Sequence, residues 1–271
     1  MGSLLRLVRV RNLLLSAAGV AIGGVLAQGR PVIPRVVWWA MASAVCLGAA
    51  GNVANDIADR DADAVNRPDR PLVKGSVGLN VALGVGGIAG GMGLLIAWMI
   101  DLRQFGIALA ALLVMLFYSP LLKRFGILGN LAVAVVASLP PIYGAAAVGW
   151  WRAGLVASVL AAILHFAREI VKDLEDMAGD LAQGRSTVPL VWGRETAFVI
   201  AAAALITFVP LSLAPWFAHW YGARYALVVI ALDVVILGLI ARLLARQLDG
   251  ASALLKGAML AGLAALLWDR L

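Results

Sequence analysis

Long apolar runs separated by short polar segments dominate the chain. A membrane-spanning α-helix needs about 17 to 25 mostly apolar residues to cross a hydrocarbon layer about 30 Å thick, and Pro, Gly and charged residues mark the breaks between such runs. The pattern therefore predicts nine membrane-spanning helices, at residues 13–27, 36–55, 79–100, 105–122, 127–148, 153–171, 196–213, 225–244 and 251–268. We expect a single all-α membrane domain over residues 1–271.

The composition supports this interpretation. With 63% hydrophobic and 14% charged residues and a mean hydropathy of +0.95, the chain has more apolar surface than a soluble domain can bury. The basic start followed by an apolar run could belong to a signal peptide, but eight further runs favour a retained first helix. No nucleic-acid-binding motif is recognisable, so the net charge of +7 is better explained by membrane topology.

Lys and Arg are distributed unequally between the two sides of the predicted helices. If the N-terminus is internal, 16 of the 22 basic residues fall on the internal side. Eight of the nine Trp residues lie near the opposite helix ends, as in an interfacial aromatic belt. The sequence thus predicts a multi-pass protein of the cell membrane with a cytoplasmic N-terminus.

Ten of the fifteen carboxylates lie in two windows, 56–69 and 169–180, after the second and sixth predicted helices. At about 100° per residue, each window forms one polar helical face. The first face contains Asn52, Asn55, Asp56, Asp59 and Asp63, and the second contains Glu169, Asp173, Asp176 and Asp180. Asp61 and Glu175 are expected to point away from these faces.

Rows of carboxylates repel one another, and their desolvation near lipid adds to the cost. A cation must compensate, and Mg²⁺ is commonly held by a few carboxylates together with substrate phosphates. Two acidic faces around a diphosphate would suit this chemistry. The alternative is that these are solvated helix ends, whose acids pair with Arg60, Arg67, Arg168, Lys172 and Arg185.

The first window reads NDxxDxxxD over residues 55–63, and the second reads KDxxDxxGD over residues 172–180. With their spacing and positions, these motifs resemble those of the UbiA superfamily of intramembrane prenyltransferases. Further segments are similar to that family over the whole chain, namely residues 66–71, 118–124 and the pair Gly129-Asn130. Residues 9–12 resemble the family's N-terminal segment, except that Val10 replaces its usual proline.

The resemblance implies nine helices around a central cavity, with Mg²⁺ as cofactor and a polyprenyl diphosphate as donor. It implies metal coordination by Asn55, Asp59, Asp63, Asp173, Asp176 and Asp180, with Asp56 as a further partner. Asp59, Asp176 and Lys123 are the implied catalytic residues. Substrate binding is implied for Arg9, Asn12, Arg67, Tyr118, Lys123, Arg124, Asn130 and Lys172. The basic residues could instead be topology markers, and Tyr118, Asn130 and Tyr143 could serve packing. Asp233, inside the eighth predicted helix, has no assignable partner.

The acceptor is less constrained. Residues 168–176, 179–180 and 184–189 most resemble the branch of the family that uses prenylglyceryl phosphates, such as geranylgeranylglyceryl phosphate, in archaeal-type membrane lipids. The alternative acceptor is a 4-hydroxybenzoate-like aromatic acid, whose carboxylate Arg9 or Arg11 would bind. A cation transporter should carry acids near the bilayer midplane, and an intramembrane aspartyl protease should carry two isolated facing aspartates. Neither pattern is present.

Overall fold

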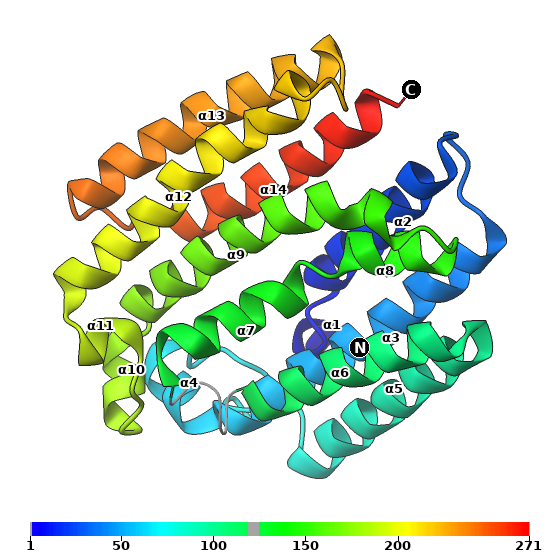
Figure 1. Ribbon diagram of the computed structural model, residues 1–271. Helices are drawn as coiled ribbons and strands as arrows, with labels where there is room; N and C mark the ends of the chain where they lie inside the picture. Colours follow the sequence, from blue (N-terminus) through cyan, green and yellow to red (C-terminus); the bar gives the residue numbers. More distant parts are fainter. Residues whose placement is uncertain (1, 119–124, 271) are drawn as a thin grey trace.

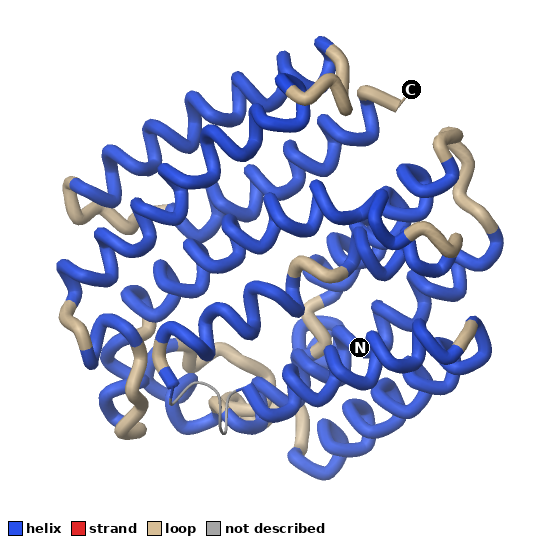
Figure 2. The backbone as a smooth tube through the Cα atoms, in the orientation of Figure 1, coloured by secondary structure: helices blue, strands red, loops and turns tan. Residues whose placement is uncertain are grey.

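The computed structural model describes residues 2–118 and 125–270, and every regular element in this part of the chain is helical (Figures 1 and 2). The long helices are α2 (Val10–Gln28), α3 (Arg35–Ala58), α5 (Leu79–Ile100), α6 (Leu102–Tyr118), α9 (Leu155–Glu175), α12 (Arg194–Phe217), α13 (Ala223–Leu244) and α14 (Ala251–Trp268). The shorter ones are α1 (Gly2–Leu7), α4 (Arg60–Asn66), α7 (Ile127–Ala137), α8 (Pro140–Ala147), η2 (Trp151–Gly154), α10 (Met177–Ala182) and α11 (Val188–Val191).

The membrane-spanning segments agree with the sequence prediction in approximate position, and eight of the nine expected spans are long enough to qualify in the described part of the chain. In the described residues, eight segments are long and apolar enough to cross a bilayer. The ninth expected span corresponds to the shorter apolar helix α6, and its predicted end at residue 122 lies outside the described residues. Many large apolar side chains on these helices are exposed, such as Ile88 and Leu227, because lipid rather than protein covers them.

One expected helix is broken. The sequence predicts a continuous helix over residues 127–148, but α7 ends at Ala137 and α8 begins at Pro140. Pro140 and Pro141 lack the backbone N–H that would continue the helix, and their rings clash with the preceding turn. Together α7 and α8 still cover the length of one span.

Six helices form a closed ring in which each contacts the next, in the order α2, α3, α6, α7, α9 and α14, with α14 returning to α2. Helix α8 packs inside this arrangement against α2, α3 and α9. Helix α5 packs on α3 and α6, while α12 and α13 pack against α9 and α14 (Figure 1). The ring encloses the space in which the candidate site lies.

Candidate active site

The two acidic motifs meet at one end of the ring. The first motif occupies the last turn of α3 and continues into α4, and the second occupies the last turn of α9 and continues into α10. The main helical axis is interrupted in each case, at Asp59 and at Asp176. Helices α4 and α10 then pack against each other at the same end of the molecule (Figure 1).

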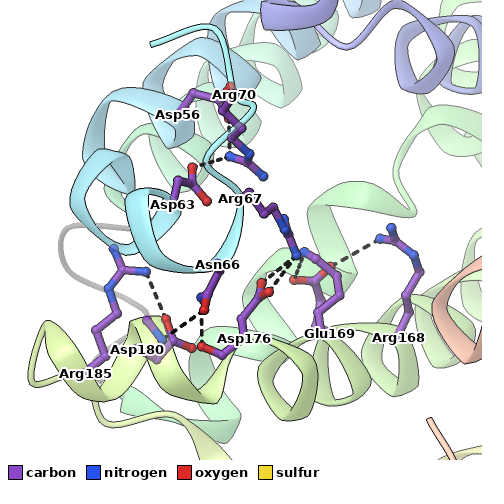
Figure 3. Close-up of polar contacts among 12 residues, drawn as sticks. Asp56, Asp63, Asn66, Arg67, Arg70, Arg168, Glu169, Asp176, Asp180 and Arg185 are labelled. Carbon is purple, nitrogen blue, oxygen red and sulfur yellow. Dashed lines mark hydrogen bonds and ion pairs between the residues drawn. The ribbon is translucent and has the colours of Figure 1, made fainter. Parts of the chain in front are cut away.

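A clasp between Asn66 and Gly179 fixes this contact (Figure 3). The Asn66 amide nitrogen donates to the backbone carbonyl of Asp176 at 2.9 Å, and its carbonyl oxygen accepts from the backbone N–H of Gly179 at 3.0 Å. A Cβ atom at position 179 would lie 2.3 Å from the Asn66 amide nitrogen and 2.7 Å from the Ala62 carbonyl oxygen. Only glycine permits this approach, so the identity of residue 179 sets the distance between the motifs.

A small polar pocket of about 50 Å³ lies between the motifs. Its lining includes all six residues for which the family resemblance implies metal coordination, namely Asn55, Asp59, Asp63, Asp173, Asp176 and Asp180. Asp61 and Glu175 are exposed and do not line this polar pocket, which confirms the prediction from helical spacing that they point elsewhere.

Arginines connect the acids across the two motifs. Arg67, which follows the first motif, donates to both carboxylate oxygens of Asp176 in the second, at 2.7 and 2.8 Å (Figure 3). In the opposite direction, Arg185 follows the second motif and contacts Asp59 at 2.6 Å, as well as Asp180 at 3.2 Å. These pairs give the polar pocket a wall of alternating positive and negative charge.

Asp56 occupies a different position from the other acids. It is buried, does not line the polar pocket, and pairs with Arg9 and with Arg70, the latter at 2.6 Å. Arg70 also contacts Asp63 at 2.6 Å. Both arginines line the polar pocket, so Asp56 lies behind them and orients them.

Asp63, which contacts Arg70, is electrostatically perturbed. Burial raises the pKa of Asp63 to about 6, and the neighbouring Asp59 and Asp56 charges add to the rise while Arg70 opposes it. Burial also lowers the pKa of Arg70, with a further contribution from Arg9. A cation placed among these acids would lower the pKa of Asp63 again and keep it ionised.

Other candidate substrate residues take up varied positions. Lys172 lines the polar pocket and donates to the buried Glu169 at 2.9 Å. Asn130 is buried and does not line the polar pocket, and its amide donates to Asp173 at 2.8 Å, so it orients that acid. Lys123 and Arg124 lie outside the described residues, as does the side chain of Tyr118.

The residues of the polar pocket suit a divalent cation of the Mg²⁺ type. The donors are carboxylate and amide oxygens, which Mg²⁺ prefers. The side-chain oxygen of Asn55 is buried and accepts no hydrogen bond from the described residues. Among those residues, no three His, Cys, Asp or Glu side chains are grouped as in a preformed metal cage. The arrangement therefore fits an ion held jointly by a few protein oxygens and by substrate phosphates.

A larger, mostly apolar cavity of about 350 Å³ adjoins the polar pocket inside the helical ring; we call it the main cavity. Its walls come from α2, α3, α6, α7, α8, α9 and α12 to α14, and they include Tyr143, which is buried and hydrogen-bonded to Ser43 at 2.8 Å. Four residues line both spaces and thus mark their junction: Arg9, Asn55, Glu169 and Lys172.

The structure supplies the partner that the sequence left open for Asp233. The hydroxyl of Ser212 on α12 donates to this carboxylate on α13 at 2.9 Å. Ser212 in turn accepts from the Tyr225 hydroxyl through its backbone carbonyl, at 2.6 Å. This polar cluster joins α12 to α13 at the wall of the main cavity, far from both motifs in sequence.

Several residues of the site were not assigned a metal or substrate role from the sequence. Asn66 ends α4, while Arg70 and Arg185 lie in the basic segments that follow the motifs. Arg185 was expected only as a partner of the motif acids, and the signal for both arginines was their closeness to acids in sequence. Glu169 was on the predicted second polar face but was not assigned a role. Lys256 on α14 lines the main cavity, and nothing in its local sequence indicated this.

Comparison with known proteins agrees with this geometry. The model of the UbiA prenyltransferase family matches residues 16–263. A digeranylgeranylglyceryl phosphate synthase from Thermococcus kodakarensis is 34% identical over 235 residues, which cover 86% of this chain and 83% of the relative. A solved structure described for digeranylgeranylglyceryl phosphate synthase is 26% identical, with a TM-score of 0.80 and coverage of 99% of this chain and 98% of the other.

A further solved structure, of a UbiA homologue from Archaeoglobus fulgidus bound to DMAPP and Mg²⁺, has a TM-score of 0.72 at 19% identity. It covers 97% of this chain and 99% of its own, so the likeness extends over the whole fold.

Proposed function

The chain belongs to the UbiA prenyltransferase family, and on this premise we propose that it transfers a geranylgeranyl group from geranylgeranyl diphosphate to geranylgeranylglyceryl phosphate in the synthesis of membrane ether lipids. It is a multi-pass membrane prenyltransferase. The names of its relatives support the choice of acceptor, as does the form of the second motif.

The observation that carries the proposal is the junction between the polar pocket and the main cavity. A prenyl diphosphate has a charged head and a long apolar tail, and the two spaces match these two parts in polarity. The bond that breaks in prenyl transfer joins the head to the tail. It would therefore lie at the junction, beside Arg9, Glu169 and Lys172.

The proposed reaction breaks the allylic C–O bond, whose electron pair leaves with the diphosphate. The acceptor hydroxyl oxygen then forms a bond to the allylic carbon, and its proton passes to the released diphosphate. Negative charge develops on the leaving diphosphate, and Arg67, Arg185 and Lys172 are positioned to stabilise it through charge-assisted hydrogen bonds. The apolar walls of the main cavity keep bulk water away from the carbon centre.

The proposed cofactor is Mg²⁺, held by Asn55, Asp59, Asp63, Asp173, Asp176 and Asp180 together with diphosphate oxygens. When bound, it would neutralise charge on the leaving group. The A. fulgidus homologue that was determined with DMAPP and Mg²⁺ supports this assignment. EDTA should therefore abolish turnover, and added Mg²⁺ should restore it.

We place the protein in the cell membrane with its N-terminus and both motifs on the cytoplasmic side. The unequal distribution of Lys and Arg supports this orientation. The exposed Trp38, Trp98 and Trp220 also support it, because each lies near a helix end on the side opposite the motifs.

A competition assay tests the acceptor. Purified protein in detergent with Mg²⁺ and labelled geranylgeranyl diphosphate is offered geranylgeranylglyceryl phosphate and 4-hydroxybenzoate together. We expect the label in the ether lipid. A labelled aromatic product would instead support the aromatic prenyltransferase, and release of diphosphate with neither product would contradict both assignments.

A further inference from the structure

A second group of cations lines the main cavity, apart from the arginines of the polar pocket. Lys256 on α14 donates to the side-chain carbonyl of Asn12 on α2 at 2.6 Å. Arg168 on α9 reaches the backbone carbonyl of Ser252, one turn before Lys256, at 3.4 Å. Three helices that are distant in sequence thus bring Asn12, Arg168 and Lys256 to one part of the wall.

Within this group, the charge of Lys256 is not balanced by an ion pair in the described residues, whereas Arg168 contacts Glu169. Around the polar pocket, Arg67, Arg70 and Arg185 each pair with at least one carboxylate. By contrast, no ion pair of Lys256 occurs in the described part of the chain, and its charged neighbours are Arg168 and Arg11, both positive. A cation within a membrane helix is costly and is usually retained for a function.

Arg168 and Lys256 also lie close to the junction between the polar pocket and the main cavity. Arg168 contacts Glu169 at 3.6 Å and lies on the side of Glu169 away from Asp176 (Figure 3). Glu169 and its partner Lys172 line both spaces, so the cations of the main cavity and those of the polar pocket face the junction from two sides. Lys256 is near the start of α14, at the end of the bundle that carries the motifs.

We propose that Lys256, Arg168 and Asn12 bind the phosphate of the lipid acceptor. This inference rests on the proposed function and names the residues that recognise its acceptor. An acceptor phosphate held there leaves the glyceryl hydroxyl free to reach the junction, where the allylic carbon lies. The two phosphorylated substrates would then be separated by the Glu169–Lys172 pair, which limits the repulsion between their charges.

The test compares Lys256→Gln with the parent protein, in steady-state assays that vary each substrate in turn. We expect KM for geranylgeranylglyceryl phosphate to rise about tenfold, the loss expected for one charge-assisted hydrogen bond. KM for geranylgeranyl diphosphate should stay within about twofold. Lys256→Arg should recover most of the acceptor affinity, because it restores the charge.

The matched control is Lys74→Gln, since Lys74 is exposed and its partner Asp69 is exposed as well. This change should alter neither KM. A second arm uses geranylgeranylglycerol, which lacks the phosphate. The parent should prefer the phosphorylated acceptor, and Lys256→Gln should reduce that preference about tenfold.

Three results would overturn the inference. If Lys256→Gln raises KM for both substrates equally, the cation serves the diphosphate. If Lys256→Gln changes neither KM, the acceptor phosphate binds elsewhere. In either of these two cases the proposed function still stands, provided that the parent protein transfers the prenyl group to the lipid. If the parent does not use geranylgeranylglyceryl phosphate at all, the proposed function and this inference fail together.

Discussion

Nη2 of Arg67, which follows the first motif, contacts both carboxylate oxygens of Asp176 in the second motif, at 2.7 and 2.8 Å, although the two residues are 109 positions apart. One guanidinium nitrogen is shared between the two oxygens, so this charge-assisted pair ties the carboxylate to the segment after the first motif. The two motifs are consequently one site, and a change in either one alters the geometry of the other.

The first prediction separates the acids of the polar pocket from exposed acids in the same motifs. Asp59→Asn and Asp176→Asn should each lower kcat/KM by at least about a hundredfold, because they remove charge that faces the cation and the leaving group. Asp61→Asn and Glu175→Gln are the matched controls, and both residues are exposed. Equal losses in all four variants would contradict the assignment.

The second prediction concerns the pair between Arg67 and Asp176. Arg67→Lys keeps the charge but replaces the planar guanidinium, whose Nη2 contacts both oxygens of Asp176, with an ammonium on a more flexible side chain, so KM for the prenyl diphosphate should rise about tenfold. Arg60→Lys is the matched control, since Arg60 is exposed at the start of α4. If Arg67→Lys behaves like the parent protein, position 67 provides only charge.

The third prediction concerns the close contact between α4 and α10. Gly179→Ala should destabilise the protein by about 1 to 3 kcal/mol, because its Cβ would overlap Asn66 and Ala62. Thermal unfolding in detergent measures this, and activity should fall at the same time. Gly91→Ala in α5 is the matched control, since a Cβ there meets no atom within 4 Å.

A double variant tests whether the clasp accounts for this cost. Asn66→Ala removes both hydrogen bonds of the clasp and should itself destabilise the protein. Its effect should be less than additive with that of Gly179→Ala, because the two residues act on one contact. Strict additivity would indicate that the two positions are independent.

The fourth prediction concerns topology. In a Cys46→Ser background, cysteines at the exposed positions 61 and 175 should be labelled from the same side of sealed vesicles, and a cysteine at position 30 from the other. All three side chains are exposed, so accessibility does not limit the reaction. Labelling of 61 and 175 from opposite sides would contradict the arrangement of the motifs.

The sequence predicted the helices and the motif acids well, for a physical reason. Lipid requires each span to be a continuous apolar stretch, and the acids repeat with the helical period, so both signals are local. The span predicted over 127–148 is confirmed in position, but the sequence reading did not anticipate the break inside it, which Pro140 and Pro141 cause.

The remaining features depend on tertiary contacts. The pairing of Arg67 with Asp176 and of Asn12 with Lys256 joins residues more than a hundred positions apart. No local sequence pattern specifies which basic residue forms an ion pair with which acid, because these pairs depend on how the helices pack. For the same reason the sequence did not indicate that the Asn130 amide donates to Asp173.

The Asn66–Gly179 clasp has a consequence for how such sequences can change over time. The two residues are 113 positions apart, yet the hydrogen bonds of Asn66 depend on the close approach that glycine at 179 permits. A larger residue at 179 would meet the Ala62 carbonyl oxygen as well as Asn66, so α4 and α10 would have to move apart and the hydrogen bonds of Asn66 would be lost. In an alignment of related chains, positions 66 and 179 should therefore vary together or remain fixed together, as a correlated pair.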